Sequence, residues 1–214
     1  LMLQNQTEEE FADSRFQVLS ELTRLRQLCC DPALVYENYE GGSAKLDLCI
    51  ELIQSAVESG HKILLFSQFT SMIEILTARL QEESISCFVL QGSTKKEQRA
   101  QMVEQFNRDD TSVFCISLKA GGTGLNLTGA DIVIHYDPWW NVAVENQATD
   151  RAHRIGQKNV VTVYKLIAKG TIEEKIIKLQ QMKEELAEEI LSGDEIKTAS
   201  FQREELLELL EERF

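Results

Sequence analysis

Short apolar segments that alternate with helical patterns are the feature that most constrains the fold of this chain. Five such segments are expected as strands, at residues 62–66, 87–90, 113–117, 132–135 and 160–166. Between them, apolar residues recur at helical spacing near residues 44–59, 70–83, 95–107 and 142–153. Strands that are apolar along their whole length are buried on both faces, which is typical of parallel sheets covered by helices. The pattern predicts an α/β fold with a central, mainly parallel sheet in a three-layer domain.

The sequence divides into a core and two helical ends. Residues 1–43 are expected to form an N-terminal helical extension, with a helix near 8–29, and a linker that ends in Gly41-Gly42-Ser43. Residues 44–170 carry the strand and helix alternation, and residues 171–214 are expected to form bracing helices at about 171–191 and 202–212. A chain of 214 residues with 43% hydrophobic content is long enough for one substantial core.

Charge is distributed unevenly along the chain, whose formal net charge is −13. Residues 45–170 carry 14 acidic and 13 basic side chains, so the acidity belongs mainly to the terminal helices. The core is therefore compatible with a nucleic-acid partner, although the whole chain is acidic.

Cysteine spacing and hydropathy indicate an intracellular protein. The five cysteines lack C-x-x-C spacing and the three histidines are scattered, so we expect reduced thiols and no metal site. The sequence has neither an apolar run of about 18 residues nor a secretory signal, so no membrane partner is expected. A bacterial source would place the protein in the cytoplasm or nucleoid, and a eukaryotic source in the nucleus. Because the chain starts at Leu1, we expect a piece excised from a longer protein.

The segment QATDRAHRIGQ, residues 147–157, contains the strongest candidate for catalysis. It sets Gln147, Arg151 and Arg154 at i, i+4 and i+7 of a predicted helix, so their polar heads are expected on one face. Two guanidiniums on one face suit a polyphosphate, and we interpret them as arginine fingers, which stabilise the charge on a transferring phosphoryl group.

The sequence lacks the other half of such an active site. No G-x-x-x-x-G-K-[ST] motif occurs, and no acidic pair follows a hydrophobic strand to hold a metal. The nucleotide-holding residues are therefore expected in a partner lobe.

Polar segments follow the first two predicted strands. Ser67 and Gln68 precede a predicted helix, and Gly92, Ser93 and Thr94 precede two lysines at the next helix start. Hydroxyls, amides and close-approach glycines at helix N-termini suit phosphate contacts. The alternatives are a helix cap with a core phenylalanine in the first segment, and solvated lysines in the second.

The loop after the third predicted strand is rich in glycine. It reads SLKAGGTGLNL, residues 117–127, and includes Lys119, Gly122, Thr123, Gly124 and Asn126. Its bare backbone can approach a ligand closely, and the segment can face both ways, toward a nucleic-acid strand and toward a ribose. The alternative is a tight loop with no ligand.

A pair of tryptophans follows the fourth predicted strand, in the segment DPWWN. Trp139 and Trp140 point in different directions, so at most one of them is expected to be fully buried. An exposed ring can stack on a base or wedge against a sugar-phosphate backbone, whereas pure packing is the alternative.

Four segments together resemble one protein family. ILLFSQFTSMIEIL, LQGSTKKEQR, SLKAGGTGLNLTGADIVIHYDPWWN and QATDRAHRIGQ are similar to the second RecA-like lobe of Swi/Snf-type ATPases, the DNA-translocase branch of superfamily-two helicases. The resemblance extends from about residue 19 to 174, and DPWWN followed by HRIGQ is its most specific part. Val142 stands where the family usually has proline after WWN.

This resemblance implies a division of roles among the candidate residues. ATP with Mg²⁺ would be held mainly by a first lobe absent from this chain, and Arg151 and Arg154 would reach its phosphates. On the nucleotide side the resemblance places Gly122, Gly124 and Asn126, with Gln147 coupling this surface to the DNA. The residues that would hold double-stranded DNA are Ser67, Gln68, Gly92, Ser93, Thr94, Lys119, Thr123 and Trp140.

The expected function is that of a motor lobe that lacks ATPase activity on its own. Its expected partners are double-stranded DNA and the first RecA-like lobe of the same parent chain, and the isolated chain is expected to be monomeric. Two alternatives share some of the same residues: an RNA helicase lobe, and an interaction module whose motor is no longer active.

Overall fold

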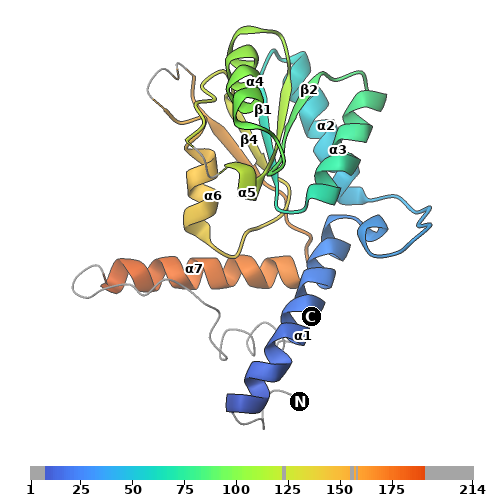
Figure 1. Ribbon diagram of the computed structural model, residues 1–214, viewed down its shortest axis with the longest axis vertical. Helices are drawn as coiled ribbons and strands as arrows, with labels where there is room; N and C mark the ends of the chain where they lie inside the picture. The colour runs from blue at the N-terminus through green and yellow to red at the C-terminus, as the bar shows by residue number, and fades with distance from the viewer. Residues whose placement is uncertain (1–7, 122–123, 155–156, 158, 191–214) are drawn as a thin grey trace.

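The computed structural model describes residues 8–121, 124–154, 157 and 159–190 (Figure 1). Five strands form one sheet in the order β2-β3-β1-β4-β5, and every neighbouring pair is parallel. The strands are β1 (Ile63–Ser67), β2 (Cys87–Leu90), β3 (Val113–Ser117), β4 (Ile132–His135) and β5 (Thr162–Lys165). The helices are α1 (Glu8–Cys30), a short 3₁₀ turn η1 (Pro32–Leu34), α2 (Ala44–Glu58), α3 (Thr70–Glu82), α4 (Lys96–Arg108), α5 (Leu118–Gly121), α6 (Val142–Thr149) and α7 (Ile172–Ile190). The expected α/β fold class is confirmed.

Two hydrophobic cores lie on opposite faces of the sheet and make three layers. On one face, side chains of α2 and α3 such as Ile53 and Leu76 pack against alternate residues of the central strands, including Leu65. On the other face, α4, α5 and α6 pack against the residues between them, such as Phe66 and Phe114. The central strands β1, β3 and β4 are buried throughout, as their apolar sequences predict.

The structure corrects two predicted boundaries. The helix expected over 142–153 ends at Thr149, because Arg151 N bonds to Ala148 O at 3.2 Å and Ala152 N to Thr149 O at 3.1 Å. These i to i−3 bonds tighten the chain into turns. The last strand covers Thr162–Lys165 and all four of its residues are exposed, so its edge position overrides the apolar reading of 160–166.

The long helices α1 and α7 pack against each other beside the carboxyl ends of the strands (Figure 1). Leu22 of α1 forms a small buried cluster with Ile172, Ile176 and Leu179 of α7. No helix in the described residues is both long and apolar enough to cross a membrane.

A buried ion pair joins α2 to α7. Lys45 Nζ lies 2.7 Å from both carboxylate oxygens of Glu173, whose side chain is fully buried. Glu173 also accepts a hydrogen bond from Ala168 N at 2.8 Å. Burial raises the pKa of Glu173, and Lys45 opposes that rise. The ammonium is therefore needed to hold an ionised carboxylate at this depth.

Replacing Lys45 with methionine should destabilise the protein in a pH-dependent way. At pH 7, Lys45→Met leaves Glu173 charged and unpaired, so the free energy of unfolding should fall by about 3–5 kcal/mol. Burial raises the pKa of Glu173 and Lys45 opposes that rise, so the folded-state pKa is higher still in the variant. The deficit is therefore present above the variant's pKa and shrinks as the pH falls through it, because protonation removes the charge. Urea denaturation between pH 7 and pH 4.5 measures both effects.

The exposed Lys95 provides the control for this measurement. Lys95→Met should change the free energy of unfolding by no more than about 0.5 kcal/mol at any of these pH values. A Lys45→Met deficit that is equally small, or one that grows on acidification, would contradict this account of the ion pair.

Candidate nucleotide and nucleic-acid site

Parallel pairing brings the ends of β1, β3 and β4 to one edge of the sheet. Ser67 pairs with Ser117, and Phe66 pairs with His135. The segments that follow these strands therefore start side by side, which is where open α/β sheets bind ligands. The candidate residues Ser67, Gln68 and Trp140 belong to this edge, whereas the two arginines come after α6 has crossed back along the sheet (Figure 1).

The glycine-rich segment bonds directly to the arginine-bearing turn. Arg154 Nη1 donates to Gly124 O at 3.3 Å, and Leu127 N donates to Arg151 O at 3.0 Å. Gly124 has φ +40°, a left-handed conformation that favours glycine. The segment thus starts at the end of β3 and bonds to both arginines, while its contacts to a nucleic-acid strand and to a ribose stay predictions.

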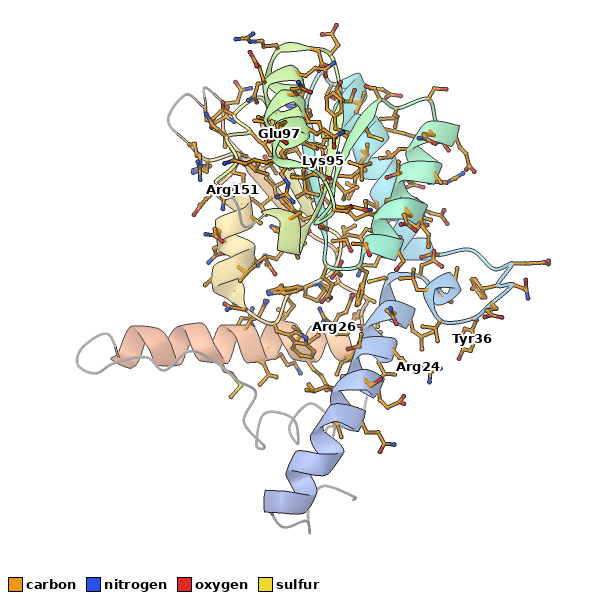
Figure 2. The ribbon with its side chains drawn as sticks, viewed as in Figure 1. Arg24, Arg26, Tyr36, Lys95, Glu97 and Arg151 are labelled. Atoms are coloured by element: carbon orange, nitrogen blue, oxygen red, sulfur yellow. The ribbon has the colours of Figure 1, made fainter. Side chains whose placement is uncertain are left out.

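Arg151 lies beside the end of α6 and is only 2% exposed (Figure 2). Its Nε atom is buried and has no hydrogen-bond partner among the described residues. Burial first, and then the charge of Arg154, lower the pKa of Arg151, which nevertheless keeps its charge because a guanidinium starts from so high a value. Two guanidiniums that repel each other, one with an unsatisfied donor, form a site that an anion would stabilise.

Gln157 holds the arginine-bearing segment against the sheet. Its Nε2 atom donates to Ala130 O at 2.6 Å and to Thr128 O and Ala152 O, each at 3.3 Å. Two of these carbonyls follow the glycine-rich segment and the third lies between the two arginines, so one side chain ties the chain after that segment to the turn with the arginines.

Asn126 and Gln147, also predicted on the nucleotide side, make no side-chain hydrogen bond to either arginine within the described part of the chain. Asn126 is exposed, and its carbonyl accepts a hydrogen bond from Asn107 Nδ2 at 2.8 Å. Gln147 is exposed on α6, whereas the arginines lie in the turns after that helix has ended. Gly122 lies outside the described residues.

Asn107 was missed from the sequence, although it positions the glycine-rich segment. Besides its bond to Asn126, its Oδ1 atom accepts from Gly129 N at 2.9 Å. A Cβ atom at Gly129 would meet Asn107 Oδ1 at 3.0 Å, so glycine permits this close approach. An asparagine near a helix end gives no sequence signal for a contact 22 residues away.

Ser67, a residue predicted to contact DNA, is the last residue of β1. Its side chain is fully buried, and Oγ donates to Asp137 Oδ1 at 2.5 Å. Gln68 N also donates to this carboxylate, at 3.3 Å. The DNA contact expected of Ser67 stays a prediction, while in the structure its hydroxyl satisfies a buried acid and ties the loop after β1 to the loop after β4.

The segment after β2 presents its small residues to solvent. Gly92 and Ser93 are exposed, whereas Thr94 Oγ1 accepts from Gln91 N at 3.1 Å and closes the turn. Arg99 of α4 braces this turn, because its guanidinium donates to the carbonyls of Gln91, Gly92 and Thr94 at 2.9–3.2 Å. This arginine is a second residue that the sequence did not single out.

Both tryptophans are half-buried, in agreement with the expectation that at most one is fully buried. Trp139 packs on the core beside α6, and its backbone N donates to Glu145 Oε2 at 3.1 Å. Trp140 packs on the cluster between α1 and α7, under the guanidinium of Arg26 at 4.6 Å from the ring centroid. Lys119 lies in α5, whose lysine side chain is not described, and Thr123 lies outside the described residues.

Comparison with known proteins gives a consistent family. The helicase conserved C-terminal domain matches residues 44–156. An uncharacterized ATP-dependent helicase of Mycoplasma pneumoniae is 45% identical over 92% of this chain and 19% of its own length. A putative ATP-dependent helicase/translocase of Bacillus subtilis, YwqA, is 45% identical over 83% of this chain and 20% of its own. The human chromatin-remodeling ATPase INO80 is 43% identical over 78% of this chain and 11% of its own.

Solved structures agree with the sequence relatives. The Sulfolobus solfataricus SWI2/SNF2 ATPase C-terminal domain gives a TM-score of 0.70 at 33% identity, covering 91% of this chain and 81% of that one. The ATPase core of the same organism in complex with dsDNA gives 0.73 at 34% identity, covering 94% and 43%. The chain spans about a fifth of the length of the first bacterial relatives. It belongs to the helicase conserved C-terminal domain family, as the second RecA-like lobe of a SWI2/SNF2-type ATPase.

Proposed function

We propose that this chain is the C-terminal motor lobe of an ATP-dependent double-stranded DNA translocase. The observation that carries the proposal is the arginine pair, because Arg151 is buried with an unsatisfied Nε while Arg154 bonds to Gly124 of the glycine-rich segment. The relatives named as ATP-dependent helicases, and the related ATPase core solved with dsDNA, support the two ligands.

Arg151 and Arg154 act as arginine fingers on a nucleotide held mainly by the first lobe. Their paired positive charge stabilises the charge that develops on the transferring phosphoryl group. Among the described residues, no cluster of histidine, cysteine or acidic side chains is placed to hold a metal. In the proposed arrangement Mg²⁺ is held with the ATP phosphates by the first lobe, and this chain supplies guanidinium groups and backbone from the glycine-rich segment.

DNA is held through its backbone by the segments that follow the strands. Gly92 and Ser93 are exposed on a turn braced by Arg99, and Gln68 and Trp140 lie at the edge where β1 and β4 end. The proposed set includes Thr94, Lys119 and Thr123, while Ser67 supports the site from inside through Asp137. Contacts to phosphates carry little sequence preference, so the motor is expected to act on any duplex.

ATP turnover is coupled to movement by closure of the two lobes. Closure brings the arginines to the nucleotide, and opening after hydrolysis withdraws them. Because the glycine-rich segment starts beside the DNA-facing loops and ends at the arginines, it is the part of this lobe that meets both ligands. Such closure is driven by a difference in ligand affinity between the open and closed states.

Removing either arginine should abolish most of the DNA-stimulated ATP turnover of the full-length protein. Arg151→Ala and Arg154→Ala should each lower kcat by about 10²–10³-fold, because stabilisation of the transition state is lost. ATP binding should be retained, since the first lobe holds the nucleotide. Steady-state hydrolysis with and without duplex DNA, alongside equilibrium binding of a fluorescent ATP analogue, measures the two effects separately.

The exposed His153, which lies between the two arginines, provides the matched control for these variants. His153→Ala should retain turnover within about twofold, as expected of an exposed side chain to which the proposal assigns no role. Arginine variants as active as the His153 variant would overturn the proposed roles. Stimulation by RNA in place of duplex DNA would favour an RNA helicase lobe.

The isolated 214-residue chain should hydrolyse no ATP, because it supplies only the arginine side of the site. Phosphate release measured at micromolar protein should equal the buffer background, with or without duplex DNA. Turnover that follows the chain through successive purification steps, and that Arg151→Ala removes, would show instead that this lobe is catalytically sufficient.

A further inference from the structure

One buried arginine links α1 to both loops at the DNA-facing edge of the sheet. Arg26 Nη2 donates to Pro138 O at 2.7 Å, in the loop after β4. Its guanidinium carbon lies 4.6 Å from the centroid of the Trp140 ring and 5.7 Å from that of Phe69, in the loop after β1. The residue as a whole is 3% exposed.

Arg26 is also a counter-charge to a buried acid. Asp137 is 1% exposed, and burial raises its pKa, whereas the hydrogen bond from Ser67 and then the charge of Arg26 lower it. Burial lowers the pKa of Arg26 itself, with Asp137 as the main opposing charge. Each charge therefore compensates the other, and removing either one would leave an unpaired buried charge that destabilises the fold.

The orientation of Arg26 is specific to its place on α1. Figure 2 shows Arg26 on the side of the helix that faces the sheet, whereas Arg24, two residues earlier, lies on the outer side. Arg24 is exposed. The same helix thus offers a buried arginine in contact with the loops and an exposed one of identical chemistry.

We propose that Arg26 is a positioning residue for DNA-stimulated ATP turnover, acting through Trp140. Its planar guanidinium covers one face of the indole while it hydrogen-bonds the backbone two residues earlier, so ring and loop are fixed together. Trp140 also packs between α1 and α7, so a shift of either helix changes the position of the ring proposed to contact DNA. The inference rests on the translocase function proposed above.

The test uses the full-length protein and compares Arg26→Met with Arg24→Met. Methionine keeps the length of the arginine stem but removes the charge and the planar donor group. Arg26→Met should lower the maximal rate of ATP turnover with saturating duplex DNA by about three- to tenfold, the usual range for a residue that couples two sites. Because Arg26→Met leaves Asp137 without its counter-charge, rates are compared per folded protein. On that basis turnover without DNA and the KM for ATP should stay within about twofold of wild type, and Arg24→Met should match wild type throughout.

A double-mutant cycle separates positioning from general structural support. If Arg26 acts through Trp140, the double variant Arg26→Met/Trp140→Leu should be no slower with DNA than Trp140→Leu alone. Arg26→Lys, which retains the charge over the ring, should recover part of the lost stimulation.

Four results would contradict these roles. Arg26→Met that behaves like Arg24→Met, losses that multiply in the double variant, or an equal loss of DNA-independent turnover would each overturn the positioning role and leave the translocase function standing. Wild-type protein that duplex DNA does not stimulate would overturn the translocase function itself.

Discussion

Parallel pairing of buried strands is the constraint on which the rest of this structure depends. β1, β3 and β4 bury both of their faces, so helices must cover the sheet on two sides and each connection must return the chain to the same starting edge. The polar segments that follow the strands consequently gather at the opposite edge. The candidate DNA contacts come from that geometry, although they are far apart in the sequence.

Buried charges attach the two terminal helices to this framework. Lys45 and Glu173 join α2 to α7, and Arg26 with Asp137 joins α1 to the end of β4. A buried charge without its partner is strongly unfavourable, whereas apolar contacts tolerate small shifts in the position of a helix. The apolar cluster between α1 and α7 therefore stabilises their packing, and the ionic groups specify one position for each helix.

The sequence predicted the architecture better than the individual contacts. β1 and β3 are apolar up to their final serine, and this pattern predicts buried strands whatever the details of side-chain packing. The arginine pair was recognised by spacing, yet a single predicted helix was the wrong reason, since α6 ends at Thr149 and the arginines lie in the turns beyond it. Asn107, Arg99 and Arg26 were missed because their partners are backbone groups or rings elsewhere in the chain, and the identity of a residue does not reveal such partners. The bond from Ser67 to Asp137 was missed because the two residues lie 70 positions apart in the sequence.

The bond between Arg154 and Gly124 has a consequence for how quickly the site can respond. The guanidinium rests on an uncharged carbonyl at 3.3 Å, a long and weak hydrogen bond. A phosphate oxygen offers a charged acceptor, and charge-assisted bonds are shorter and roughly twice as strong as neutral ones. The side chain is exposed, so it can exchange one acceptor for the other by rotating about its own bonds, without unpacking the core. Arg154 is therefore oriented beside the glycine-rich segment but weakly bound there, and under the proposed function a nucleotide would need to break only this one bond.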